Sequence, residues 1–225
     1  MFFESAGAIA VGWVDEVFVS PEFTFSFMGF EWLQPLPGNG MYFYFVLMAF
    51  CSIAAALGYR YRIAIISLAV LWSGVYLMHK ASLNNHHYLM FLLSWMMVFT
   101  PAAKRFSLDS LRDGVQTKCY AFYWYLYVLL FLIVFTYAAL AKVYPDWLAA
   151  IPLKYWLSFK GNTLLVGKLL STDIMPWLMA YGGILFDLLV IPGLLYHKTR
   201  KWAFIASIVF HITNSLTFQI GTSLI

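Results

Sequence analysis

The 225-residue sequence has few charged residues and few cysteines. Asp, Glu, Lys and Arg make up only 11% of it, whereas 63% of the residues are hydrophobic and 20% are aromatic. A soluble domain of this size carries about 25% charged residues, so the polar surface is too small to cover the apolar mass. The composition excludes a globular cytosolic enzyme, a disordered chain and a disulfide-rich secreted module. Cys51 and Cys119 are too few for a disulfide framework or a thiolate metal site.

Long apolar runs indicate an integral membrane protein instead. A membrane-spanning helix needs about 20 mostly apolar residues. Met1–Val14 is apolar but short and contains Glu4, so we expect it to be the end of a truncated first helix. The other expected spans are Met41–Gly58, Ile63–His79, His87–Ala103, Tyr120–Ala141, Pro176–Tyr196 and Trp202–Ile225. The sequence therefore predicts an all-α helical membrane bundle of about seven spans, folded as a single domain over residues 1–225.

The basic residues gather in every second connection between these spans, which predicts the orientation. The positive-inside rule places such loops on the cytoplasmic side. On the opposite side we expect the acidic connection Asp15–Gly40, the turn Lys80–His86 and the stretch Val143–Ile174. The last of these is too interrupted to span and too apolar to be free in water, so it predicts interfacial helices. The net charge of +4 belongs to the loops, and we expect a lipid bilayer rather than nucleic acid as the partner.

Lys142 lies at the outer end of the expected span Tyr120–Ala141. One interpretation is a snorkelling lysine, whose stem is buried while its ammonium reaches the headgroups. The other is a desolvated lysine, because burial lowers the pKa of an amine and allows it to act as a base near neutral pH. The position alone is compatible with both interpretations.

Asn84, Asn85, His86 and His87 form a polar run at the outer turn, close in depth to Lys142. Asparagines are common in turns and helix caps, which explains part of the run. Amide and imidazole groups also donate hydrogen bonds to an anionic oxygen. Both a capping role and an anion-stabilising role stay open at this point.

Three more polar residues lie within expected spans. His211 and Asn214 are one helical turn apart on the last span, either as packing residues or as part of a site. Asp187 must be neutral or paired at membrane depth, and Lys142 or a histidine are the candidate partners.

Two adjacent glycines, Gly182 and Gly183, precede Asp187 and permit the close approach of another helix, which is a packing explanation for them. The sequence contains five histidines and lacks the HExxH, GxSxG and phosphate-binding glycine motifs, which argues against metal catalysis and serine hydrolysis. We therefore expect no metal site. The residues alone indicate a helical bundle with an outer polar cluster suited to an amphipathic or lipid-soluble ligand.

Three strings resemble vitamin K-dependent gamma-glutamyl carboxylases and their bacterial relatives, which share a transmembrane module called the HTTM domain. Lys80–Leu89 is similar to the signature turn of that family, and Tyr137–Leu148 is similar to its second motif, a small-residue helix end followed by lysine and Asp-Trp. His211–Gly221 resembles the string His-x-x-Asn…Phe-x-Ile-Gly. Phe23–Gly40 also resembles bacterial members, so the resemblance covers nearly the whole chain.

The resemblance implies a vitamin K-dependent carboxylase mechanism. Lys142 would be the base that deprotonates vitamin K hydroquinone, and Asn85 and His86 would stabilise the resulting oxyanion. Oxygen addition then produces a strong base that removes a gamma-proton from glutamate, and the carbanion captures carbon dioxide. By the same resemblance we expect the quinol site to include Asn84, His87, Tyr137, His211 and Asn214.

The chain also departs from the carboxylases. They carry a large lumenal domain after the transmembrane part, whereas this sequence stops at Ile225, so we expect an HTTM-type domain that is incomplete at both ends. The implied partners are a quinone and a glutamate-bearing peptide or protein. The alternative is a non-catalytic HTTM protein that binds a quinone or another lipid, or acts as a transporter or partner subunit.

Overall fold

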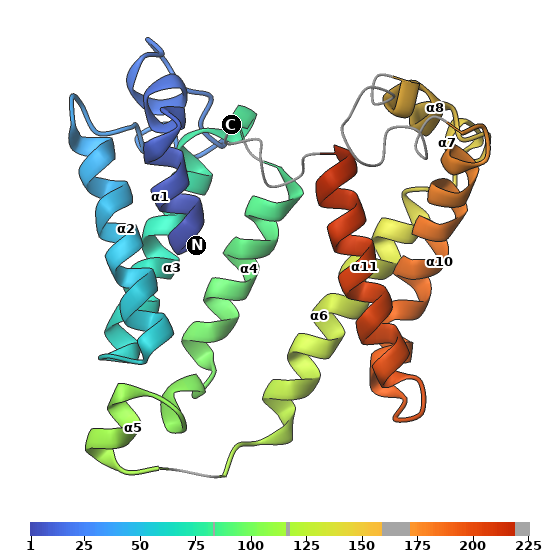
Figure 1. Ribbon diagram of the computed structural model, residues 1–225. Helices are drawn as coiled ribbons and strands as arrows, with labels where there is room; N and C mark the ends of the chain where they lie inside the picture. The colour runs from blue at the N-terminus through green and yellow to red at the C-terminus, as the bar shows by residue number, and fades with distance from the viewer. Residues whose placement is uncertain (83, 116–117, 159–171, 219–225) are drawn as a thin grey trace. The chain divides into compact units, whose positions relative to one another are not determined.

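The computed structural model describes residues 1–82, 84–115, 118–158 and 172–218 (Figure 1). All regular secondary structure in these ranges is helical, which confirms the all-α prediction. The described residues divide into two compact units, Met1–Cys119 and a second unit that begins at Tyr120. Each unit is described by itself.

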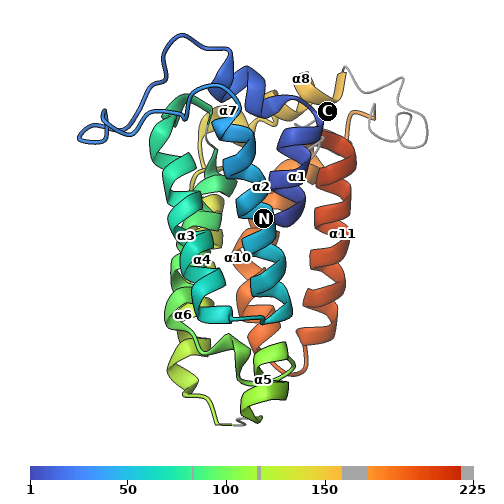
Figure 2. The same cartoon turned by 90° about the vertical axis from the view of Figure 1, so that its left-hand side faces the viewer.

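The first unit is a bundle of α-helices joined by short irregular helices. Helix α1 packs on α2, α2 on α3, and α3 on α4 (Figures 1 and 2). The interior is filled by large apolar side chains such as Phe45, Met48, Ile65 and Trp72, whose burial stabilises the unit. The elements are α1 (Phe2–Ala10), η1 (Asp15–Val19), α2 (Gly40–Leu57), α3 (Tyr61–Met78), η2 (Lys80–Ser82), α4 (Asn85–Phe99), η3 (Ala102–Lys104) and α5 (Leu108–Asp113).

Helix α3 depends on α5 for its N-terminal cap. Its own N-cap residue, Arg60, has a left-handed backbone and offers no capping side chain. Instead, the Asp109 carboxylate of α5 accepts hydrogen bonds from the backbone N–H groups of Arg60 at 2.9 Å and Tyr61 at 2.8 Å. A carboxylate at this place satisfies N–H groups that a helix leaves unpaired and complements the positive end of the helix dipole.

The second unit is built around one long helix. Helix α10 packs against both α6 and α11, and the short helices α7 and α8 lie against one end of it (Figure 1). Two hydrogen bonds fix α7 to α10: Trp147 Nε1 donates to the Ala180 carbonyl at 3.3 Å, and the Tyr181 hydroxyl donates to the Leu148 carbonyl at 3.0 Å. The elements are α6 (Ala121–Leu140), α7 (Pro145–Leu148), α8 (Ile151–Ser158), α10 (Met175–Leu195) and α11 (Arg200–Phe218).

Four helices among the described residues are long and apolar enough to cross a membrane. They are α2, α3, α6 and α10, which supports an integral membrane protein. Helices also lie where the spans His87–Ala103 and Trp202–Ile225 were predicted, but α4 is shorter than its predicted span and residues 219–225 are outside the described ranges. The total of seven spans and the side that faces the cytoplasm stay predictions. Of the helices predicted for the connection 143–174, α7 and α8 are found, and residues 159–171 lie outside the described part.

The Asp109→Ala variant tests the cap of α3. Removal of the carboxylate leaves two N–H groups without their acceptor, so we expect the free energy of unfolding to fall by about 1–2 kcal/mol. Asp113→Ala is the matched control, because the exposed Asp113 carboxylate pairs with the side chain of its neighbour Arg112 and not with the backbone N–H groups at the start of α3. Thermal unfolding in detergent micelles measures both variants. Equal melting temperatures for the two variants would contradict the capping role.

Candidate functional site

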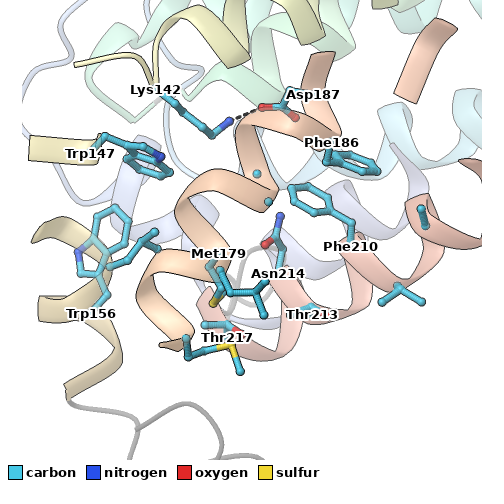
Figure 3. Close-up of a pocket in the computed structure, with 17 residues that line it drawn as sticks. Lys142, Trp147, Trp156, Met179, Phe186, Asp187, Phe210, Thr213, Asn214 and Thr217 are labelled. Atoms are coloured by element: carbon cyan, nitrogen blue, oxygen red, sulfur yellow. Dashed lines mark hydrogen bonds and ion pairs between the residues drawn. The ribbon is translucent and has the colours of Figure 1, made fainter. Parts of the chain in front are cut away.

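An ion pair between Lys142 and Asp187 is the main polar contact of the candidate site in the second unit. Lys142 follows the end of α6, and Asp187 lies in the middle of α10, so the pair joins the two helices (Figure 3). The Asp187 side chain is only 4% exposed, and the Lys142 side chain is 24% exposed. Lys142 is one of the two kinds of partner that the sequence suggested for Asp187. The amine is paired within the unit, and the snorkelling and desolvated interpretations of Lys142 both stay predictions.

Two further groups surround the Lys142 amine. It donates a second hydrogen bond to the Ala138 carbonyl at 3.2 Å, one helical turn earlier in α6. The ring of Trp147 lies 5.9 Å from Nζ, at the outer limit of a cation–π contact. A carboxylate, a carbonyl and an aromatic face all stabilise a positive charge at this nitrogen.

The pair forms the polar wall of a cavity of about 1020 Å³ (Figure 3). Most of the lining is apolar or aromatic, as in pockets that hold drug-sized or larger ligands. Every lining residue belongs to the second unit. Besides the ion pair, the lining includes Trp147 and Trp156 from α7 and α8, Met179 and Phe186 from α10, and Phe210 and Asn214 from α11.

Gly182 and Gly183 line the cavity and do not serve a close helix contact. A Cβ atom built on either glycine meets no atom within 4 Å among the described residues. The close helix approach that these glycines permit is therefore not made by any described residue. A close approach occurs at Gly193 instead, where a Cβ would lie 3.0 Å from the Cβ of Ala203 in α11. Helices α10 and α11 thus pack tightly near Gly193, and the glycine pair leaves open space one turn before Phe186 and Asp187.

The cavity face of α11 includes Asn214 but not His211. Asn214 extends into the cavity beside Phe210 (Figure 3). His211 is exposed, and its ring contacts the edge of Phe186 at a centroid distance of 6.1 Å. The Phe210 ring stacks on Phe186 at a centroid distance of 3.8 Å, and both rings line the cavity, whereas His211 is not among its described lining residues. Of the two residues predicted from α11, Asn214 is therefore positioned to meet a ligand in this cavity.

The polar run Asn84–His87 lies in the first unit. The Asn84 side chain caps α4 by accepting hydrogen bonds from the N–H groups of His86 and His87. His87 is 7% exposed: its Nδ1 accepts a hydrogen bond from the Asn84 N–H, and its Nε2 lies 3.5 Å from Glu4. Asn84 and His87 thus have structural partners. The side chains of Asn85 and His86 are exposed, and their meeting with Lys142 at one site stays a prediction.

Tyr137 is the remaining predicted cofactor residue. Its side chain is 69% exposed, and it does not contribute to the described lining of the cavity. Its place on α6 is one turn and one residue before Lys142, so the two side chains project from different parts of the helix surface. The role of Tyr137 in quinol binding stays a prediction.

Several lining residues were not identified from the sequence, although their spacing carries a signal. On α11 the lining positions recur every three or four residues, which is the spacing of one helix face. Trp147 belongs to the quoted Asp-Trp motif but received no role. The α11 positions are Ala206, Val209, Phe210, Thr213, Asn214 and Thr217.

The ion pair makes a prediction about stability. Lys142→Met leaves the buried Asp187 carboxylate without its cation, so we expect the free energy of unfolding to fall by about 3 kcal/mol. This value is at the low end for such pairs because Lys142 is partly exposed. Replacing both residues, as in Lys142→Met with Asp187→Leu, removes the unpaired charge and should restore most of the melting temperature. Thermal unfolding in detergent micelles measures the single and double variants. Additive losses in the double variant would show that the two residues are not coupled.

Comparison with known proteins identifies the chain's family. No solved structure matches the chain. The model of the HTTM domain family matches residues 1–223, which include both compact units. The chain therefore belongs to the HTTM domain family.

Proposed function

We propose that this chain is a vitamin K-dependent carboxylase-like membrane module. It deprotonates and oxygenates a vitamin K hydroquinone, and this reaction is coupled to gamma-carboxylation of glutamate. The observation that carries the proposal is the Lys142–Asp187 pair in the wall of a large apolar cavity. HTTM domains are found in vitamin K-dependent carboxylase-related proteins, which supports the same chemistry.

The cavity fits an amphipathic quinol. Its volume of about 1020 Å³ is at the upper end of the usual range for small-molecule sites. The rings of Trp147, Trp156 and Phe210 offer faces for an aromatic head group, and the apolar remainder suits a hydrocarbon tail. The Lys142–Asp187 pair and the Asn214 amide are the polar groups that a quinol hydroxyl needs.

The residues around the pair supply what the first step requires. Deprotonation of a phenol needs a proton acceptor and a positive charge for the oxyanion. The Lys142–Asp187 pair provides both within one contact. The mostly apolar lining is unfavourable for water, and a bound quinol that displaced the remaining water would protect the strongly basic product that oxygenation supplies. The resemblance assigns further stabilisation of the oxyanion to Asn85 and His86, whose side chains are exposed on the first unit.

Substitution of Lys142 tests this proposal. In purified chain reconstituted into lipid nanodiscs with reduced menaquinone-4, we expect Lys142→Ala to lower the rate of oxygen-dependent quinol oxidation by at least about 100-fold, the usual effect of losing acid–base catalysis. Lys154→Ala is the matched control, because Lys154 lies in the same unit over the ring of Trp177 and outside the described cavity lining. Epoxide formation, measured by chromatography, and incorporation of labelled carbon dioxide into a glutamate peptide report the two halves of the reaction.

The same assay separates the proposal from its alternative. A wild-type chain that binds menaquinone-4 but forms no epoxide would be a quinone- or lipid-binding HTTM protein. Full epoxide formation by folded Lys142→Ala would show that the Lys142–Asp187 pair is not needed for the reaction. Epoxide formation without carboxylation would restrict the activity to the quinol half of the reaction.

A further inference from the structure

A groove in the first unit lies between the end of α2 and the short helix α5, and its volume is about 540 Å³. Its lining combines exposed apolar side chains with the guanidinium group of Arg105. We propose that this groove binds an anionic phospholipid, with the lipid phosphate at Arg105 and an acyl chain along the apolar lining. The inference is independent of the proposed function, because the groove and the cavity of Lys142 belong to different units.

The fold places the groove at the end of two helices that can span a bilayer. Helix α2 ends at Leu57 and α3 begins at Tyr61, and both helices are long and apolar enough to cross a membrane. Helix α5 lies against the turn between them, where the Asp109 N–H donates to the Gly58 carbonyl at 2.9 Å (Figure 1). A Cβ atom on Gly58 would clash with Ser107, so the turn and this segment are in direct contact. Because spanning helices end near the lipid headgroups, the groove lies at headgroup depth.

The large apolar side chains that line the groove are all exposed. Phe106 is 90% exposed and Leu111 is 80% exposed. The other three, with exposed fractions from 44% to 58%, are Leu57, Leu108 and Val115. Exposed apolar groups that gather on one surface are typical of protein or membrane contacts, and at headgroup depth they gain from contact with acyl chains. The apolar lining therefore suits a hydrocarbon chain.

The charge of Arg105 is not neutralised within the described part of the chain. Of the acidic residues in α5, Asp109 caps α3 and Asp113 pairs with Arg112. No carboxylate among the described residues forms an ion pair with Arg105. Its guanidinium lies 4.8 Å from the centre of the Phe106 ring, which holds it beside the apolar lining. A guanidinium offers paired N–H donors that match two phosphate oxygens, so this group suits an anionic headgroup.

The combination of charge and apolar surface favours a phospholipid over simpler ligands. A free phosphate would pair with Arg105 but would leave Leu111 and Phe106 uncovered. A neutral hydrocarbon would cover the apolar side chains but would leave the guanidinium without a counter-ion. A phospholipid satisfies both parts of the groove, and the bilayer supplies it at this depth.

Binding of phosphatidylglycerol tests the charged part of the groove. In native mass spectrometry of the purified, delipidated chain, we expect phosphatidylglycerol to bind at least about fivefold more tightly than phosphatidylcholine with the same acyl chains. Arg105→Gln should remove most of this preference and change the affinity for phosphatidylcholine by less than about twofold. Lys201→Gln is the matched control, because it removes one positive charge at an exposed position of the second unit. An equal loss of preference in Lys201→Gln would show a net-charge effect and overturn the inference.

Leu111→Ser tests the apolar part of the groove. The side chain is exposed, so we expect the melting temperature to stay unchanged. The affinities for phosphatidylglycerol and phosphatidylcholine should fall to a similar extent, since both lipids lose the same apolar contact. Glycerol phosphate carries the anionic group without acyl chains, and we expect it not to displace phosphatidylglycerol from the wild type. Displacement by glycerol phosphate, or unchanged lipid binding in Leu111→Ser, would show that the site does not bind an acyl chain.

Hydrogen exchange locates the bound lipid. A lipid that covers the groove holds α5 against the turn between α2 and α3, so openings of α5 become rarer. In lipid nanodiscs we expect the amides of α5 in the wild type to exchange more slowly with phosphatidylglycerol than with phosphatidylcholine, and those of Arg105→Gln to exchange equally in both. Equal exchange in the wild type, or the same slowing in Arg105→Gln, would overturn the inference without affecting the proposed quinol chemistry.

Discussion

The contact between Lys142 and Asp187 is the interaction on which the packing of α6 against α10 and the proposed chemistry depend. It joins α6 to α10 at a depth where either charge alone is costly, so each residue explains the presence of the other. The same contact forms a polar part of the wall of a mostly apolar cavity. A structural requirement, the pairing of a buried carboxylate, thereby places a cation and a proton acceptor next to a space large enough for a ligand.

The cavity exists because α10 and α11 pack unevenly. Gly193 lets α11 approach closely, whereas Gly182 and Gly183 leave space that no described side chain fills. Gly costs about 1 kcal/mol relative to Ala within a helix, so two such residues in open space are unfavourable for folding alone. Their missing side chains leave room in the cavity one turn before Asp187.

Composition and apolar runs were sufficient to predict the helical membrane class, because a bilayer requires long apolar helices. They were also sufficient to limit the expected partners of Asp187 to Lys142 or a histidine, since few partners exist for an aspartate at that depth. They did not predict the open space beside Gly182 and Gly183, because a small residue is equally compatible with close packing and with open space. They also could not separate the capping role of Asn84 from a binding role, since both use the same side-chain oxygen.

Absorbance spectroscopy tests directly whether the Lys142–Asp187 pair ionises a bound quinol. Reduced menaquinone-4 is titrated anaerobically into the wild-type chain and into the variant with Lys142→Met and Asp187→Leu. We predict that the bound quinol shows the absorbance of its ionised form in the wild type and of its neutral form in the double variant. Equal ionisation in both proteins, or a neutral quinol bound to the wild type, would contradict the account.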